Sequence, residues 1–360
     1  MKRKQIIISI IVVVVLAALV YLQIREWRRF DWQKFAEGSA GINWLRVLSG
    51  VALVYLADFL RAIRWKVLLR PTRPDVPWKD LVAPTYVGFA GLAILGRPGE
   101  LVRPYLIGLK TKTAFSAQMA IWAIERIFDI TAVVIMLVIV IFFVPSLRTI
   151  DHYQAFREFG YALIGIVVVL VGLAVTLRLV GPSFAAWVCR VISPLSPRMG
   201  AAAERKIRSF SEGLDTLRDP MSILQVSGIS MVIWILVAFA YREVTHAYPI
   251  DTGIPALDLP QVVLLMGASV VGGVLQLPVV GGGAQLATIA VLNNVFDTGP
   301  ELAVSCGILF WLVTFMSIAP VGLILAHFEH LSLRKITEES ESLEEAAPAS
   351  LPACPPEHPQ

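Results

Sequence analysis

Residues 118–144 read QMAIWAIERIFDITAVVIMLVIVIFFV, and this stretch decides the fold class of the chain. As a helix it would extend about 40 Å at roughly 1.5 Å per residue, which exceeds the roughly 30 Å hydrocarbon core of a bilayer. Because lipid offers the backbone no hydrogen-bond partner, such a run has to be helical there. The stretch therefore predicts a membrane-spanning helix.

Apolar runs of similar character recur along the 360 residues, of which 56% are hydrophobic and only 16% charged. This balance does not suit a surface that faces only water. The clearest runs cover residues 6–24, 42–60, 118–144, 162–180, 223–244, 262–277 and 302–326. We predict an all-α, polytopic transmembrane helical bundle with about six full spans, the first of them an uncleaved helix rather than a signal peptide.

Charge bias in the loops predicts the orientation. Residues 178–218 are rich in arginine and should be cytoplasmic, whereas residues 242–258 and 297–301 are acidic and should face outward. Both termini are then cytoplasmic, and we expect a multi-pass protein of the cell (inner) membrane.

The chain divides into one transmembrane domain and a tail. The domain covers residues 1–332 and includes a cytoplasmic amphipathic segment over residues 182–220, where apolar residues recur at helical spacing among charged ones. Residues 333–360 are rich in glutamate and proline, and we expect a disordered acidic tail on the cytoplasmic side.

Two short apolar segments are expected to dip into the membrane and return as re-entrant hairpins. Residues 83–95 have basic loops on both sides, so they should enter from the cytoplasm. Residues 262–296 run between acidic loops, and their centre, LPVVGGG at 277–283, does not sustain a helix. Interrupted elements of opposite orientation indicate a transporter with an inverted repeat. The alternative of two ordinary spans stays open, with glycine and proline merely easing their packing.

Residues 96–103, GRPGELVR, place three charges directly after the first dip. Pro98 suits the first position of a helix, so a new helix is expected here with Glu100 in its first turn. Unpaired amide groups flanked by Arg97 and Arg103 would suit a phosphate or carboxylate, and Glu100 could hold the arginines when no ligand is bound. A cap and salt-bridge staple between helices is the alternative.

A second charged cluster lies in the span over residues 118–144. Glu125 and Asp129 share one helix face, and Arg126 can pair with Asp129. Ionisable groups at membrane depth usually face a bundle interior or a wet cavity. Together with the three charges of residues 96–103 they sum to zero, so we expect a mutually neutralising buried network that an incoming anion could repartition.

Two further groups complete the candidate substrate-binding residues. Arg61 and Arg64 end the second span, where anchoring at the lipid interface explains them slightly better than a ligand contact. In the outer dip, the break would expose backbone amides, and Gln285 would add a neutral donor and acceptor. The residues of this second group are Pro278, Gly281, Gly282, Gly283 and Gln285.

Enzymatic and metal motifs are missing from the sequence. No nucleophile has an adjacent base, and there is no P-loop or H-E-x-x-H pattern. The three cysteines are far apart, and the five histidines lack ligand spacing. We therefore expect no catalytic residues, no cofactor and no metal. The net charge of +4 is attributed to cytoplasmic loops, so no nucleic-acid partner is expected.

Four segments together resemble the membrane domain of lysylphosphatidylglycerol synthases and its stand-alone relatives: FLRAIRW at 59–65, GRPGELVR at 96–103, ERIFD at 125–129, and the Pro278/Gly281–Gly283 segment. The resemblance covers roughly residues 1–330, and G-R-x-G-E-x-x-R is its most specific element. Full-length members translocate aminoacylated phosphatidylglycerol, and stand-alone relatives are treated as flippase-like lipid transporters. This chain departs from the pattern with Gln285 where many relatives have glutamate. The soluble aminoacyl-transfer domain is also missing, which argues against lipid synthesis.

Three functions follow as hypotheses. The leading one is a lipid flippase that moves a phospholipid or another anionic or lipid-linked headgroup between the two dips. The alternatives are a membrane-embedded transferase, with Glu100, Glu125 or Asp129 as acid or base, and a non-transporting scaffold for a lipid-modifying enzyme. The expected partners are membrane lipids, above all anionic ones, with a second copy of the chain and a lipid-modifying enzyme as further candidates.

Overall fold

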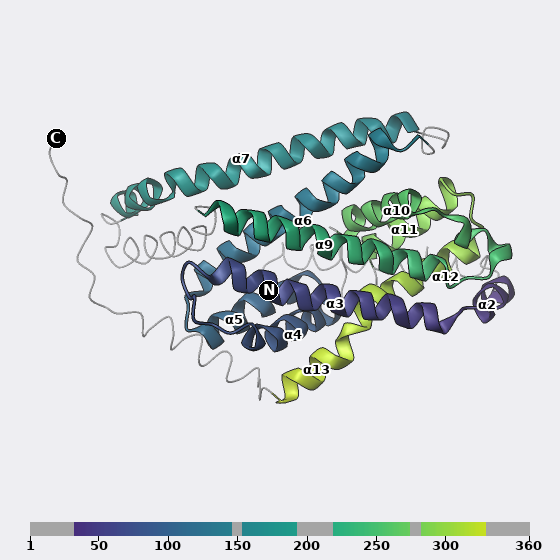
Figure 1. The fold of residues 1–360 in the computed structure, drawn as a ribbon, viewed down its shortest axis with the longest axis horizontal. Helices are drawn as coiled ribbons and strands as arrows, with labels where there is room; N and C mark the ends of the chain where they lie inside the picture. Colours follow the sequence, from purple (N-terminus) through teal and green to yellow (C-terminus); the bar gives the residue numbers. More distant parts are fainter. Residues whose placement is uncertain (1–31, 146–152, 193–218, 274–281, 329–360) are drawn as a thin grey trace, which may run out of the picture.

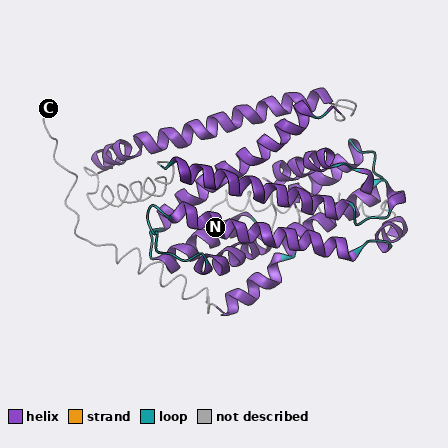
Figure 2. Cartoon of the chain, viewed as in Figure 1, coloured by secondary structure: helices purple, strands orange, loops and turns teal. Residues whose placement is uncertain are grey.

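The computed structural model describes residues 32–145, 153–192, 219–273 and 282–328. Every regular element in this part of the chain is helical and no strand occurs in it, so the all-α prediction is confirmed (Figure 2). The predictions for residues 6–24, for 193–218 within the amphipathic segment and for the tail over 333–360 lie outside the described residues.

The helices form an elongated bundle (Figure 1). The long ones are α3 (Trp44–Leu69), α6 (Phe115–Phe143), α7 (Tyr153–Ile192) and α9 (Pro220–Thr245). The shorter ones are α2 (Trp32–Ala40), α4 (Lys79–Leu95), α5 (Val102–Thr111), α10 (Leu259–Gly272), α11 (Gly282–Asn294), α12 (Pro300–Trp311) and α13 (Ile318–Phe328).

Four helical stretches in the described chain are long and apolar enough to cross a membrane: α6, the part of α7 over Tyr153–Gly172, α9, and the stretch Pro300–Phe328. A fifth results if α2 and α3, bent by 82° to each other, count as one span. Each of the expected spans 42–60, 118–144, 162–180, 223–244 and 302–326 overlaps one of these five, and 223–244 and 302–326 lie entirely within theirs. The chain is therefore a multi-pass membrane protein.

Helices α3 and α9 lie side by side and antiparallel at the centre of the bundle (Figure 1). Arg46 near the start of α3 pairs with Glu243 near the end of α9 at 3.1 Å. Arg70, just beyond α3, donates to Gln225 near the start of α9 at 3.3 Å. Both helices have side-chain caps at their N-termini, Asn43 and Asp219, which satisfy backbone amides that a helix start leaves unpaired.

Two helical hairpins pack against this central pair. In the first, α4 turns at Gly96, whose φ of 70° suits glycine, and continues through the short 3-10 helix η1 (Arg97–Leu101) into α5. In the second, α10 is followed by α11. The paired helices touch closely, because a Cβ at Gly88 would lie 2.9 Å from the Cα of Arg103 and one at Gly272 2.6 Å from the Cβ of Ala287.

The hairpins enter from opposite ends of the bundle. The first follows the C-terminal end of α3 and the second follows that of α9, and these two helices are antiparallel. Their tips meet, since the Arg97 guanidinium donates to the carbonyl of Gly273 at the end of α10. The order of long helix, hairpin and long helix thus occurs twice, as an inverted repeat with two dips requires. None of the four hairpin helices reaches the roughly 20 residues that a span needs.

Three expectations need correction in detail. Helix α7 runs over 40 residues instead of the expected 162–180. The expected single helix 302–326 is interrupted by a π-helical turn, η7 (Leu312–Met316), between α12 and α13. The helix expected to begin at residue 97 begins as a 3-10 turn, with Pro98 and Glu100 in its first turn as predicted, and α5 starts only at Val102.

Candidate functional site

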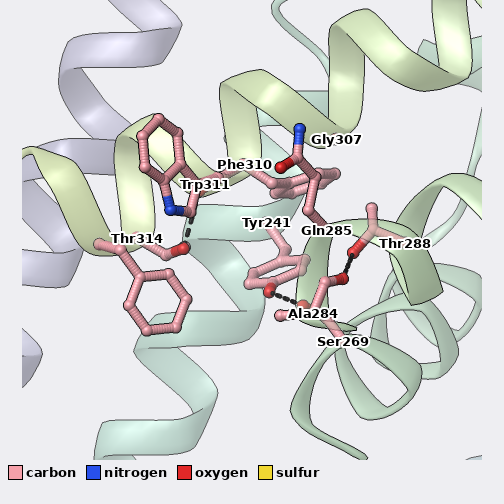
Figure 3. Close-up of a pocket in the computed structure, with 10 residues that line it drawn as sticks. Tyr241, Ser269, Ala284, Gln285, Thr288, Gly307, Phe310, Trp311 and Thr314 are labelled. Atoms are coloured by element: carbon pink, nitrogen blue, oxygen red, sulfur yellow. Dashed lines mark hydrogen bonds between the residues drawn. The ribbon is translucent and has the colours of Figure 1, made fainter. Parts of the chain in front are cut away.

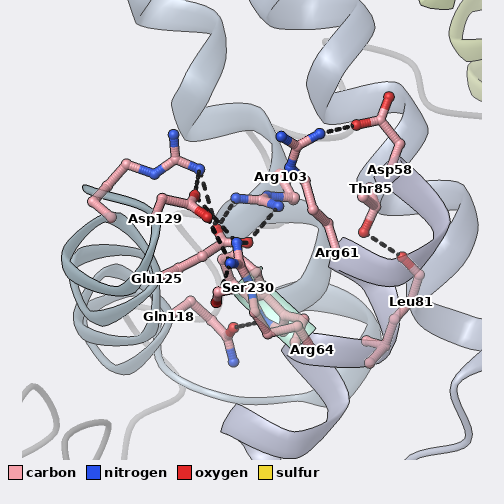
Figure 4. A network of polar contacts seen from close by, with 12 residues as sticks. Asp58, Arg61, Arg64, Leu81, Thr85, Arg103, Gln118, Glu125, Asp129 and Ser230 are labelled. Carbon is pink, nitrogen blue, oxygen red and sulfur yellow. Dashed lines mark hydrogen bonds and ion pairs between the residues drawn. The ribbon is translucent and has the colours of Figure 1, made fainter. Parts of the chain in front are cut away.

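A buried ion network lies where α3, α5, α6 and α9 converge (Figure 4). Arg64 on α3 has no exposed surface. Its guanidinium donates to Glu125 at 2.6 Å and to Asp129 at 2.6 Å, so it joins the two carboxylates of α6. Such a pair is favourable in a low-dielectric interior only where further hydrogen bonds satisfy the remaining atoms.

Arg103 on α5 supplies the second cation. It pairs with the other oxygen of Glu125, which places this carboxylate between two guanidinium groups. The Arg103 guanidinium also lies over the ring of Trp65 at 4.3 Å and that of Phe89 at 5.0 Å. The close approach of α4 at Gly88 allows α5 to bring Arg103 to this depth.

Neutral side chains complete the hydrogen bonding around the carboxylates. Ser230 on α9 accepts from Arg64 at 2.7 Å, and the indole of Trp234 donates to Asp129 at 3.1 Å. The indole of Trp65 donates to Gln118 at 3.0 Å. These contacts hold the charged groups in one arrangement, because each is itself fixed on a packed helix.

Two ion pairs flank the network. Arg61 pairs with Asp58 at 2.5 Å on α3, and Arg97 pairs with Glu100 at 2.5 Å on η1. The Arg97 side chain is 43% exposed, whereas that of Glu100 is buried. Glu100 thus pairs with Arg97, one of the two arginines that it was expected to hold, whereas Arg103 pairs with Glu125. Arg97 in turn reaches the second hairpin at Gly273.

The network carries one positive charge in excess. Five arginines, at positions 61, 64, 97, 103 and 126, face four carboxylates, at 58, 100, 125 and 129. In addition, the Nε atoms of Arg61, Arg64 and Arg126 are buried without a hydrogen-bond partner among the described residues. Unpaired buried donors and an uncompensated positive charge both favour an anion beside this cluster.

A small pocket borders the network on the side of the first hairpin. Its lining combines the charged residues Glu100, Arg103 and Arg126 with apolar residues of α4 and α6: Gly88, Phe89, Leu92 and Trp122. Arg126 pairs with Asp129 at 3.2 Å, as predicted, and keeps 32% of its side chain exposed. This pocket, which we call the charged pocket, is the place where an anion could reach the arginines.

The structure changes the predicted roles of several site residues. The expected six-residue neutral network becomes a nine-residue cluster that includes Asp58, Arg61 and Arg64 and has a net positive charge. Interface anchoring, which the sequence slightly favoured for Arg61 and Arg64, is wrong for Arg64, because it is fully buried between two carboxylates. Arg61 keeps 12% of its side chain exposed and pairs with Asp58. Because η1 has only five residues, the attraction for an anion rests on the guanidinium groups rather than on a helix N-terminus.

A second pocket borders the other hairpin (Figure 3). Gln285 and Thr288 of α11 face Tyr241 of α9, Ser269 of α10 and Trp311 of α12 across it, and the lining is completed by Ala284, Gly307, Phe310, Thr314 and Phe315. We call this the neutral pocket. Of the other predicted residues here, Gly282 and Gly283 open α11, whereas Pro278 and Gly281 lie outside the described residues.

Several residues of both pockets were missed by sequence reasoning. Ser230, Trp234 and Tyr241 are single polar or aromatic residues in an apolar helix, and such residues usually lie in a core or at an interface. Only their contacts, with Arg64, Asp129 and Ser269 respectively, assign them to a site. Asp58 carried a signal, since it stands three residues before Arg61 on one helix face.

Comparison with known families gives one match. The family model described as Lysylphosphatidylglycerol synthase TM region matches residues 6–322, which include both hairpins, both pockets and the ion network. No curated protein and no solved structure matches the chain.

Proposed function

We propose that this chain, which belongs to the lysylphosphatidylglycerol synthase TM-region family, is a lipid translocase. Membership supports a role with membrane lipids. The translocase activity itself rests on one observation: a buried arginine cluster with an excess positive charge lies beside the first hairpin, whose Arg97 contacts the tip of a second hairpin that enters from the opposite end.

The excess charge explains the choice of substrate. A phosphodiester headgroup carries one negative charge, which would balance the cluster when it enters the charged pocket beside Arg103 and Arg126. Its oxygens would also give the unpaired guanidinium nitrogen of Arg126 an acceptor. The acyl chains would stay in the surrounding lipid, so only the headgroup needs a polar path.

The hairpins explain how a path could cross the bilayer. Irregular backbone at membrane depth is tolerated where it is buried in protein or lines a wet cavity. Here Arg97 forms the contact between the two tips, with the charged pocket on one side and the neutral pocket on the other. In the proposed cycle, the headgroup passes between the pockets and replaces the Gly273 carbonyl as the acceptor of the hydrogen bond from Arg97.

We further propose that the protein lies in the cell membrane, with the C-terminal end of α3 in the cytoplasm. Lys66 and Arg70 lie at this end, and basic residues are enriched on the cytoplasmic side of membrane proteins. The proposed partners are anionic lipids, with a second copy of the chain and a lipid-modifying enzyme as further candidates. The proposed cycle includes no chemical step, so it requires no transferase activity. A scaffold that does not transport lipid would need no such arginine cluster.

Reconstituted vesicles test this proposal. Purified full-length chain is inserted into vesicles that contain fluorescently tagged phosphatidylglycerol, and dithionite quenching follows the transfer of the tag between leaflets. We expect the wild type to accelerate transfer and Arg97→Ala to slow it roughly tenfold, since a charge-assisted hydrogen bond is worth on the order of 1.5–3 kcal/mol.

Arg46→Ala is the matched control. Arg46 is 42% exposed, close to the 43% of Arg97, and it too pairs with a carboxylate, but at the far end of α3. This variant should transfer lipid like the wild type. Unchanged or faster transfer by correctly folded Arg97→Ala would contradict the proposal, and a change in the mass of the tagged lipid would favour a transferase.

A further inference from the structure

The neutral pocket holds polar groups that nothing in the described part of the protein satisfies. The amide of Gln285 and the indole N–H of Trp311 have no hydrogen-bond partner among the described residues, although both line the pocket (Figure 3). In contrast, the hydroxyls of Tyr241, Thr288 and Thr314 are engaged with Ser269, with the backbone of α11 and with that of α12. As far as the described residues are concerned, Gln285 and Trp311 are therefore available to bind a ligand.

The charge of this pocket differs from that of its neighbour. No carboxylate, lysine, arginine or histidine is among the described residues that line it. A cationic headgroup would find no counter-ion here and a second anionic group no partner, and either would be costly to bury. The lining thus suits an uncharged group that carries hydrogen-bond donors and acceptors.

The remaining lining offers aromatic surface. Phe310 and Phe315 join Trp311, and the Phe310 ring stacks on Tyr241 with centroids 4.3 Å apart. Binding sites for small molecules commonly combine such apolar walls with a few polar groups that set orientation. A polyol or sugar matches this combination, because it presents C–H faces to the rings and hydroxyls to the amide and the indole.

The backbone is also unusual at this point. Thr314 and Phe315 belong to the π-helical turn η7, and such turns inside α-helices are frequently found at functional sites. The turn lies on α12–α13, directly opposite the start of α11. The widened helix therefore contributes to the pocket wall.

A chain of contacts at the hairpin tips connects the two pockets. Ala284 lines the neutral pocket, and a Cβ at Gly273 would lie 3.6 Å from that of Ala284. Gly273 accepts from Arg97, whose partner Glu100 lines the charged pocket. A headgroup with its phosphate at the arginines could thus extend its outer part toward Gln285.

From these observations we infer that the neutral pocket is a subsite for the uncharged, hydroxyl-bearing part of a phosphodiester headgroup, such as a glycerol or a sugar. Gln285 and Trp311 select this group through hydrogen bonds. The inference deepens the proposed lipid-translocase function, on which it rests for the phosphate end of the ligand.

Equilibrium binding tests the subsite without requiring transport. The full chain in detergent is titrated with dioctanoyl-phosphatidylglycerol and dioctanoyl-phosphatidylethanol, two monoanionic phosphodiesters, of which only the first carries headgroup hydroxyls. We expect the wild type to bind the glycerol lipid about tenfold more tightly. Gln285→Leu should bring the ratio close to one, and Trp311→Phe should reduce it while keeping the ring.

Three controls separate the outcomes. Gln261→Glu changes a partly exposed residue of the α10 capping box, where glutamate also fits, and should keep the wild-type ratio. Arg126→Gln should weaken both lipids alike. Gln285→Glu should shift preference toward the ammonium of dioctanoyl-phosphatidylethanolamine.

A ratio near one in the wild type, no binding of either lipid, or an unchanged ratio in correctly folded Gln285→Leu would overturn the subsite. If the ratio behaves as expected but vesicles show no lipid transfer, the translocase proposal fails and the subsite stands.

Discussion

Arg64 is a charged residue in an environment without solvent access. It is fully buried on α3 and bridges Glu125 and Asp129, so its charge has no access to water. A buried ion pair adds little net stability when compared with apolar residues of the same volume, but removal of one partner leaves the other uncompensated. Loss of Arg64 would therefore leave Glu125 and Asp129 undercompensated.

The first prediction concerns this dependence. Arg64→Met should lower the free energy of unfolding by roughly 3–5 kcal/mol, because two carboxylates then share too few cations in a dry interior. Chemical unfolding in detergent, followed by circular dichroism, measures the loss. Arg73→Met, which breaks an exposed pair with Asp75, should cost about 1 kcal/mol or less. Equal losses in both variants would show that the network does not exclude water.

A second prediction concerns Arg126, which differs from Arg64 by its partial exposure. Arg126→Gln removes the excess positive charge while Arg64 continues to hold both carboxylates. We expect roughly tenfold weaker binding of dioctanoyl-phosphatidylglycerol with a change in stability of about 1 kcal/mol. Isothermal titration provides the binding constant. Wild-type affinity in this variant would mean that the anion binds elsewhere.

Among the elements, the first hairpin depends most on small residues. Helices α4 and α5 approach so closely at Gly88 that any Cβ would meet the backbone of Arg103. The same close approach carries Arg103 to Glu125. Packing of the hairpin and charge pairing in the network are thus coupled through one glycine.

The third prediction follows from this coupling. Gly88→Ala should lower the thermal midpoint and weaken lipid binding together, because α5 must move away from α4 and takes Arg103 with it. In Gly228→Ala the new methyl group has nothing within 4 Å, so a gain of up to about 1 kcal/mol is expected from helix propensity. A Gly88→Ala variant as stable as Gly228→Ala would contradict the close packing of α4 against α5 in the membrane.

At the scale of the whole molecule, the antiparallel pair α3 and α9 decides where each hairpin enters. The loop before α4 and the loop before α10 lie at opposite ends of the bundle (Figure 1). This arrangement predicts that the two loops face opposite sides of the membrane. It can be tested independently of any transport activity.

The fourth prediction uses cysteine labelling in intact cells, in a variant whose Cys189, Cys306 and Cys354 are replaced by alanine. Ile250→Cys lies in the loop before α10, where Ile250 is 91% exposed, and should react with a membrane-impermeant maleimide. Pro74→Cys, in the exposed loop before α4, should react only after permeabilisation. Reaction of both positions in intact cells would contradict the opposed hairpins.

Several features could be predicted from the sequence because they depend on local composition. Long apolar runs predict helices wherever lipid excludes water, and α4 ends at Gly96, whose positive φ suits glycine. The pairs Arg126–Asp129 and Arg97–Glu100 are also local, since residues three apart share a helix face. The charges of the loops predicted two hairpins of opposite orientation, and the structure places the two hairpins at opposite ends of the bundle.

The sequence by itself thus determined that this protein is helical, crosses a membrane and breaks two of its helices, since these properties follow from each segment and its solvent. Only the tertiary structure decided that Arg64 leaves the interface for the core, that the charge balance is one positive in excess, and that Gln285 faces Trp311. These features join residues that lie between about 25 and 170 positions apart, and no local pattern records which faces meet when helices pack.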